Sequence, residues 1–179
     1  YLNNYSGPTW YITASGNDTT GTGASGDPFR SIQSGINFSS DTDSVTVAAG
    51  TYVENINFRG RNIRVAGENR ETTIIDGDSS GTVVLFSGGE DSTALLKSFT
   101  IQNGSGYYTS SDREGGGIYI KSSNPTLDNL IISENVLEYP SSSNPSPNAF
   151  LKSISIFLIL VLVILYLSGW AIRAFPPAA

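Results

Sequence analysis

The feature that most constrains the fold of this chain is a repeated phrase in which a short β-branched run enters an Asp, Asn or Gly turn. The phrase occurs at Thr73–Gly77, Phe99–Gly104 and Leu130–Asn135. The central isoleucines of the three copies, Ile75, Ile101 and Ile132, are 26 and 31 residues apart. A unit of this length is too small to bury an apolar face alone, so the period predicts a solenoid of stacked coils.

Composition favours an all-β fold and narrows the available chemistry. Only 15% of the 179 residues are charged, 19 are Gly, and there is no Cys or His. Short strands joined by many turns suit this composition better than a helical bundle does. Because thiols and imidazoles are missing, catalysis by this chain would have to use carboxylates, Arg, Lys or Tyr.

The charge is unevenly distributed along the chain. All 16 acidic residues, but only eight of the 10 basic ones, lie before Pro140. An acidic body disfavours nucleic acid as a partner, since nucleic-acid binding needs a basic surface. The same composition is compatible with an extracytoplasmic protein.

Residues 1–42 are predicted to form an N-terminal strand, a loop and a capping helix. Trp10–Thr13 has the composition of a strand, and the loop spans residues 15–26. Asp27 followed by Pro28 resembles a helix N-cap and first helical residue. The apolar residues that follow at spacings of three and four are Phe29, Ile32 and Ile36. A short amphipathic helix of this kind is suited to covering the first coil of a solenoid.

Residues 43–138 are predicted to form the coils. Strand starts at Val45, Ile63 and Val83 are 18 and 20 residues apart, which is close to one coil length. The later coils are longer because of insertions such as Ser105–Glu114. Insertions of this kind usually become surface loops on one side of a solenoid.

The C-terminal part is predicted to be a linker and a membrane span. Residues 139–149 are rich in Pro and Ser and are predicted to form an extended linker, residues 150–173 a transmembrane helix, and residues 174–179 a short tail. Residues 153–172 carry no charge, and a helix of twenty residues spans roughly 30 Å, the thickness of the hydrocarbon core. A buried core helix is the alternative. The composition of the body and the first residue, Tyr1, lead us to expect export, with the body outside the cytoplasm; an incomplete gene is another explanation for Tyr1.

With these features, the chain resembles the right-handed parallel β-helix proteins of the pectate-lyase-like superfamily, as a short or truncated member with a C-terminal membrane span. The resemblance covers residues 10–137 and rests on the cap segment Asp27–Gln33, the first-coil phrase Val45–Ile56 and the glycine-rich phrase Gly115–Ile120. It implies an all-β parallel β-helix. In the lyases of this superfamily, an acidic cluster binds calcium and an Arg or Lys abstracts a proton; neither that site nor the paired Asp of the related hydrolases has a residue-by-residue match here.

Carboxylates in turns are the candidate metal ligands. Asp76 and Asp78 flank Gly77, and Glu90 would join them if the next coil stacks above. Such a group could bind Ca²⁺, the one cofactor that the sequence suggests. Asp-Gly is equally the usual chemistry of a tight turn, which is the interpretation we favour. Asn103 and Asn135 close comparable turns and are predicted to stack as an amide ladder.

Cationic and aromatic side chains are the candidate ligand-binding residues. Arg61 and Arg64 belong to a local basic stripe, and guanidinium groups bind carboxylates of acidic polysaccharides through paired hydrogen bonds. Tyr107, Tyr108 and Tyr119 flank the insertion and could stack against sugar rings. Solvated arginines and packed tyrosines are the alternatives.

These features predict a membrane-anchored, extracytoplasmic β-helix domain that binds carbohydrate or another surface partner and is not itself catalytic. The enzymatic alternative is a calcium-dependent polysaccharide lyase of the pectate type. A third possibility is the N-terminal fragment of a longer β-helix surface protein. The open end of the last coil is an unpaired strand edge, so we also expect self-association there.

Overall fold

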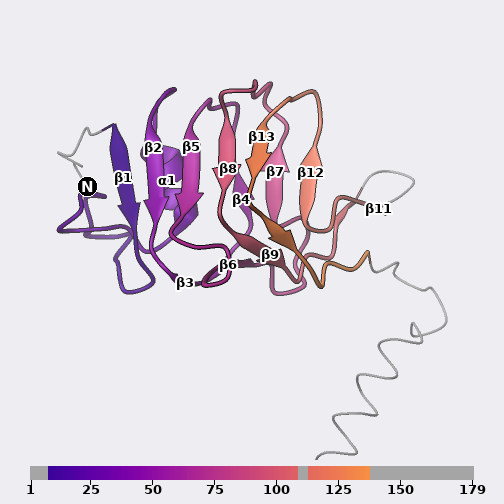
Figure 1. Ribbon diagram of the computed structural model, residues 1–179, viewed down its shortest axis with the longest axis horizontal. Helices are drawn as coiled ribbons and strands as arrows, with labels where there is room; N and C mark the ends of the chain where they lie inside the picture. Colours follow the sequence, from indigo (N-terminus) through magenta and orange to yellow (C-terminus); the bar gives the residue numbers. More distant parts are fainter. Residues whose placement is uncertain (1–7, 109–112, 138–179) are drawn as a thin grey trace, which may run out of the picture. The chain divides into compact units, whose positions relative to one another are not determined.

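The computed structural model describes residues 8–108 and 113–137 of the chain. Within these residues the architecture is a parallel β-solenoid with one short helix, α1 (Ile32–Phe38). The chain winds through three parallel sheets, so that each strand pairs with strands of the coils before and after it. Figure 1 shows the strands of the first sheet side by side along the molecule.

The three sheets share the same coil order. The first sheet contains β1 (Thr9–Ile12), β2 (Ser44–Val47), β5 (Arg64–Gly67), β8 (Leu95–Lys97) and β13 (Thr126–Asp128). The second contains β3 (Gly50–Val53), β6 (Thr73–Asp76), β9 (Thr100–Gln102) and β14 (Ile131–Ile132). The third contains β4 (Ile56–Asn57), β7 (Val84–Phe86) and β12 (Ile118–Ile120). A separate antiparallel pair is formed by β10 (Tyr107–Tyr108) and β11 (Arg113–Glu114).

Four coils follow from this order, and their numbers are used below. Coil 1 is β2, β3 and β4; coil 2 is β5, β6 and β7; coil 3 is β8, β9 and β12; coil 4 is β13 and β14. The insertion of residues 105–114 carries β10 and β11 and lies between β9 and β12, so it lengthens coil 3.

The predicted stacking of the repeated phrase is confirmed by the register. Ile75 of β6 pairs with Ile101 of β9, which in turn pairs with Ile132 of β14. Alternate residues of each strand face inward, and the inward residues of successive coils form continuous apolar columns. In the third sheet, for example, the rings of Phe58 and Phe86 are 4.2 Å apart.

The predicted alignment of Val83 with Val45 and Ile63 is wrong. Val45 pairs with Val65, and Val65 pairs with Leu96, all in the first sheet. Val83 instead precedes β7 in the third sheet. The loop between β6 and β7 lengthens coil 2, so the distance from Val65 to its equivalent Leu96 is much longer than one short coil.

The cap covers the first coil as predicted, but its helix begins later than the sequence suggested. Ser31, rather than Asp27, is the N-cap of α1, and its side chain accepts a hydrogen bond from Ser34 N. Phe29 is extended, because its backbone pairs with the far edge of β1: Phe29 N donates to Tyr11 O, and Thr13 N donates to Phe29 O. Phe29, Ile32 and Ile36 are all buried, so the predicted apolar face is confirmed.

The cap also satisfies the edge of the third sheet. The side chain of Gln33 accepts from Asn57 N at 2.7 Å and donates to Asn57 O at 3.2 Å. One amide side chain therefore replaces the neighbouring strand that β4 lacks on this side.

Among the residues that the structure describes, no helix is both long enough and apolar enough to cross a bilayer. The predicted span, residues 153–172, and the predicted linker, residues 139–149, lie outside the described residues.

Candidate functional site

A groove of about 490 Å³ lies on the outer face of the first sheet. Its lining comes from three successive coils and the turns that precede them: Thr42, Asn62, Arg64, Ser92, Thr93, Leu95 and Thr126. The lining contains hydroxyls, an amide, one guanidinium and one aliphatic side chain, and no carboxylate. This is a polar surface with a cationic centre on an otherwise acidic chain.

The strand register builds the floor of the groove. Arg64 of β5 pairs with Leu95 of β8, which pairs with Thr126 of β13. Parallel strands lie about 4.8 Å apart, so the three side chains form one outward row that spans about 10 Å. Leu95 faces outward yet is only 9% exposed, because its neighbours enclose it. It therefore gives the groove an apolar floor.

A ladder of polar side chains holds the rim of the groove. Asn62 N donates to Asp41 Oδ1 at 2.8 Å, and Asp91 N donates to Asn62 Oδ1 at 2.9 Å. Thr93 donates from its hydroxyl to Asp91 Oδ1 at 2.6 Å, and Thr126 donates from its hydroxyl to Ser92 O. Each bond joins or stiffens turns of successive coils, so the rim is fixed before any ligand binds.

Arg64 is the arginine of the predicted basic stripe that lines the groove. Within the described residues, its guanidinium makes no ion pair or hydrogen bond. Arg61 instead donates to Ser39 O and Asn37 O, which ties the C-terminal end of α1 to coil 2. Of the two predicted arginines, therefore, only Arg64 is available to a ligand in the groove.

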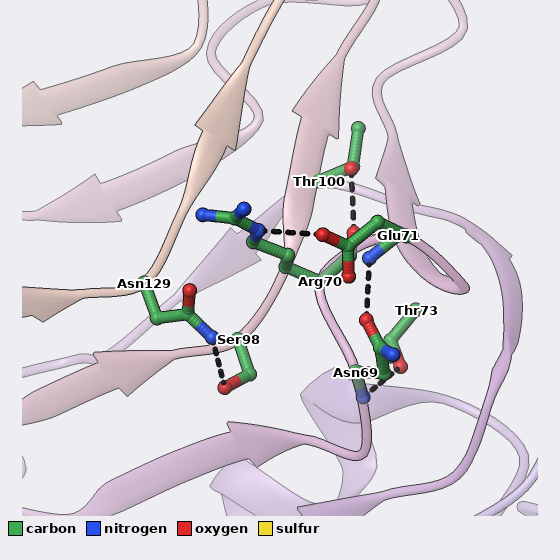
Figure 2. Close-up of polar contacts among 7 residues, drawn as sticks. All are labelled: Asn69, Arg70, Glu71, Thr73, Ser98, Thr100 and Asn129. Atoms are coloured by element: carbon green, nitrogen blue, oxygen red, sulfur yellow. Dashed lines mark hydrogen bonds and ion pairs between the residues drawn. The ribbon is translucent and has the colours of Figure 1, made fainter.

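Arg70, a third arginine of that stripe, is also engaged (Figure 2). Its Nε lies 2.8 Å from Glu71 Oε1, and its carbonyl oxygen accepts from the Thr100 hydroxyl of the next coil. Asn129 donates to Ser98 Oγ one coil further along. These bonds join coils 2, 3 and 4 at the corner between the first and second sheets.

The predicted tyrosines lie away from the groove. Tyr119 is on β12 in the third sheet, half-buried, and faces outward because its neighbours Ile118 and Ile120 continue the inward columns. Tyr107 and Tyr108 form β10. Sugar stacking on these three residues remains a prediction.

The candidate metal ligands Asp76 and Asp78 have a structural arrangement. Asp76 accepts from Gln102 Nε2 and Asn103 Nδ2 of the next coil, both at 2.9 Å, and from Asp78 N. Desolvation opposes ionisation of Asp76, but these hydrogen bonds outweigh it and lower its pKa. Asp78 has a φ of 46°, in the left-handed region, and donates its backbone N–H to the turn.

Glu90, the third candidate, is a clamp between coils. Its Oε1 accepts from Gly60 N at 2.8 Å, and its Oε2 accepts from Gly88 N at 2.9 Å and from Ser123 Oγ at 2.6 Å. Within residues 8–108 and 113–137 there is no group of three or more acidic side chains that could share a metal ion. The structure therefore does not bring Asp76, Asp78 and Glu90 together.

The predicted Asn103–Asn135 ladder is replaced by bonds to other groups. Asn103 binds Asp76, whereas Asn135 donates to Ile101 O and accepts from Gly104 N. Both side chains bind the preceding coil, as predicted, but they are not equivalent positions and do not bind each other. The ladder that does form is the one at Asp41, Asn62 and Asp91.

A second, smaller hollow of about 230 Å³ lies at the junction of the cap and coil 1. Its lining is Ala14, Asp18, Arg30, Ser31, Thr51, Tyr52, Val53 and Glu54. Glu54 accepts from Ile32 N and Gln33 N, and Asp18 accepts from Arg30 N and Ser31 N. Both carboxylates are thus used to fix the start of α1 on the solenoid.

Burial affects these two carboxylates in opposite ways. Desolvation raises the pKa of Glu54, because it exceeds the effect of the two N–H donors, and the charge of Asp18 adds to it. At Asp18 desolvation also opposes ionisation, but hydrogen bonds from Ser31, Arg30 and Ser34 outweigh it and lower the pKa. Tyr52 beside them is desolvated, which raises its pKa to about 12.

Comparison with known proteins gives one family. Residues 14–59 match a family described as "Protein of unknown function (DUF1565)", which is associated with β-helix proteins. No curated protein and no solved structure matches the chain. The matched segment contains the cap loop, α1 and coil 1, and every residue that lines the smaller hollow. Together with the parallel sheets, the match indicates a β-helix-type domain whose function the family does not reveal.

Leu95, Thr126 and Asn62 were missed as site residues by sequence reasoning. The signal that could have found them is the register of the first sheet, which places Leu95 and Thr126 in one row with Arg64. That row cannot be read from spacing alone, because the coil that contains Arg64 and the coil that contains Leu95 differ in length.

Proposed function

We propose that this domain binds an acidic polysaccharide along the outer face of the first sheet and does not itself catalyse a reaction. The observation that carries the proposal is the groove in which the unpaired Arg64 guanidinium lies beside the apolar floor at Leu95 and a rim of hydroxyl and amide groups. A sugar acid offers the matching groups: a carboxylate, an apolar ring face and hydroxyls.

The chemistry of the groove favours a carboxylated sugar over a neutral one. A guanidinium binds a carboxylate through two parallel hydrogen bonds, which adds both energy and orientation. The rim hydroxyls of Thr93 and Thr126 already donate within the protein, so their lone pairs are left to accept from sugar hydroxyls. The acidic body repels a polyanion at long range, so the proposed binding is short-range and specific to the groove.

The absence of acid–base pairs in the groove supports a binding role over a lyase or hydrolase role. No carboxylate lines the groove, and Asp76 and Glu90 already accept hydrogen bonds from the protein. General acid–base catalysis requires a positioned proton donor and acceptor within reach of the substrate.

We further propose that the domain is displayed outside the cytoplasm and anchored by residues 153–172, as a member of the pectate-lyase-like superfamily. The support is the uncharged stretch between Lys152 and Arg173 and the resemblance of residues 10–137. Resistance of the full chain to alkaline extraction from membranes is the expected result. Release into the soluble fraction would contradict the anchor without affecting the groove.

The groove is tested by affinity electrophoresis of the full chain in gels that contain polygalacturonate or a neutral glucan. We expect retardation by polygalacturonate alone, and a Kd that rises by about tenfold to a hundredfold in Arg64→Gln, since a hydrogen bond to a charged group contributes about 1.5–3 kcal/mol. Arg59→Gln is the matched control, because Arg59 is an exposed arginine outside the groove. Equal retardation of both variants and the wild type would overturn the proposed site.

A further inference from the structure

The last coil exposes side chains that belong to the core. The three inward columns end at Ile120 of β12, Leu127 of β13 and Ile132 of β14, which are 43%, 39% and 54% exposed. Val136 and Leu137, which follow β14, are exposed as well. In the described part of the chain, the large exposed hydrophobic residues are therefore concentrated at one end of the solenoid.

The exposure of these residues results from their place in the stack and not from the direction they face. One coil earlier, Phe86, Leu96 and Ile101 occupy the same positions and are completely buried. The strands of coil 4 point their aliphatic side chains inward as the other coils do, and only the next layer is missing. The surface is thus a section through an apolar core.

The backbone at this end is also unpaired. Within the described residues, β12, β13 and β14 are the last strands of the third, first and second sheets. Each pairs on one side only, so a row of N–H and C=O groups is left for another strand. A partner that covers this surface must therefore supply both aliphatic side chains and strand edges.

The opposite end of the solenoid does not offer such a partner surface. There α1 packs on β1, β2 and β4, and Gln33 satisfies the edge of β4 at Asn57. The edge of β1 is bonded to the cap loop through Tyr11 N to Gly23 O. Because only one end is open, head-to-tail stacking into a filament is excluded.

We propose that the open end is a homodimer interface, in which the last coils of two copies stack on each other. A second copy supplies the required strand edges and aliphatic residues by symmetry, and the contact closes at two copies. The end is also weakly charged: residues 117–137 contain only Lys121, Asp128 and Glu134, and Asp128 is paired with Lys97 at 2.7 Å. Little charge repulsion therefore opposes the contact.

The geometry of this dimer follows from the symmetry. A two-fold axis perpendicular to the solenoid axis reverses every strand, so β13 of one copy pairs antiparallel with β13 of the other. If the axis passes through the middle of β13, Leu127 faces its own counterpart across the interface. Directly opposed residues of antiparallel strands have Cβ atoms about 4.5–5.5 Å apart.

The dimer is tested on the full chain in detergent by sedimentation velocity over a range of concentrations. We expect a reversible dimer, and we expect Leu127→Asp to raise its Kd by about a hundredfold, or about 2.8 kcal/mol. In this variant two carboxylates would oppose each other in a desolvated contact. Val53→Asp is the matched control, because Val53 is 65% exposed on the outer face of coil 1. The control should leave the Kd unchanged.

A cross-linking experiment keeps the test valid if Leu127→Asp fails to fold. The chain has no cysteine, so Leu127→Cys provides a single thiol, which we expect to form a disulfide-linked dimer under mild oxidation. Val53→Cys should not. A wild type that stays monomeric would overturn the proposal, and so would a dimer indifferent to Leu127→Asp, which would point to the apolar residues 153–172. Failure of the Leu127→Cys thiol to react with maleimide in a monomer would overturn it in favour of a segment of the same chain.

Discussion

Glu90→Gln is the substitution that most directly tests how the coils are held together. Glu90 is 1% exposed, and its carboxylate accepts hydrogen bonds from three successive turns at the corner between the third and first sheets. Gly60 precedes coil 2, Gly88 precedes coil 3, and Ser123 precedes coil 4. One side chain therefore fixes the spacing of coils 2, 3 and 4 at this corner.

The expected loss of stability follows from which carboxylate oxygen becomes an amide nitrogen. In Glu90→Gln the side chain would present its NH₂ group either to Gly60 N or to Gly88 N, because each carboxylate oxygen accepts from one of these backbone donors. Rotation of the amide cannot avoid a donor facing a donor. A buried N–H left without an acceptor costs about 1–3 kcal/mol, and we expect a decrease of that size in the free energy of unfolding.

The loss also has a defined pH dependence. Burial disfavours the ionised form of Glu90, but the hydrogen bonds from Ser123, Gly60 and Gly88 outweigh it and hold its pKa below the ordinary value of 4.5. A group with a lowered pKa in the folded state contributes stability above its unfolded pKa and loses that contribution as the pH falls. The difference between wild type and Glu90→Gln should therefore shrink on acidification from pH 7.

The assay is urea unfolding of the full chain, followed by far-UV circular dichroism at pH 7 and at lower pH. The control is Glu71→Gln, since Glu71 is exposed and paired with an exposed arginine, and it should change stability by less than about 1 kcal/mol. Equal effects of the two substitutions at pH 7, or a difference that grows on acidification, would refute the role assigned to Glu90.

Two further predictions concern the core and the cap. Phe86→Ala removes a fully buried ring from its contact with Phe58 and should lower the free energy of unfolding by about 3–5 kcal/mol, whereas Val53→Ala, on the surface, should have little effect in the same assay. Glu54→Gln should show the opposite pH dependence to Glu90→Gln: because desolvation raises the pKa of Glu54, the wild type should gain stability relative to the variant as the pH falls. A wild type that loses stability relative to Glu54→Gln over that range would contradict the assigned environment.

The apolar pattern predicted the core because it is fixed by a local rule. Inward and outward residues alternate along a strand, and the residues Ile75, Ile101 and Ile132 are central in equivalent phrases. Their sequence intervals of 26 and 31 residues could therefore be converted into a stack. The same reasoning identified the apolar face of the cap through Ile32 and Ile36.

The errors arose where a local signal competed with pairing to a distant segment. Asp27 and Pro28 have the chemistry of a helix start, but Phe29 pairs with β1, and this keeps the backbone extended until Ser31. Val83 lies at a plausible coil spacing, but the loop before β7 changes the length of coil 2. Neither the pairing partner nor the loop path is encoded within the short window in which the signal was read.

The candidate site was predicted only in part for a related reason. Arg64 was singled out by its charge, and the structure places it in the groove. Leu95 and Thr126 have no unusual chemistry and become site residues only through their register with Arg64. The carboxylates Asp76 and Glu90 attracted attention as ligands, although their partners are amide, hydroxyl and backbone donors of neighbouring coils.

The different roles of corners and faces explain why motif chemistry in this chain points to structure and the groove does not. Polar side chains join successive coils at all three corners, through Glu90, Asp76 and the Asn129–Ser98 pair among others. These turns must use Asp, Asn, Ser and Gly whatever the protein binds, because each coil adds backbone groups that need partners. The outward rows of the sheets carry no such requirement. A charged residue there that lacks a partner within the described chain, as Arg64 does, is therefore the better indicator of a ligand, and the acidic turn motifs are the better indicators of where one coil is fastened to the next.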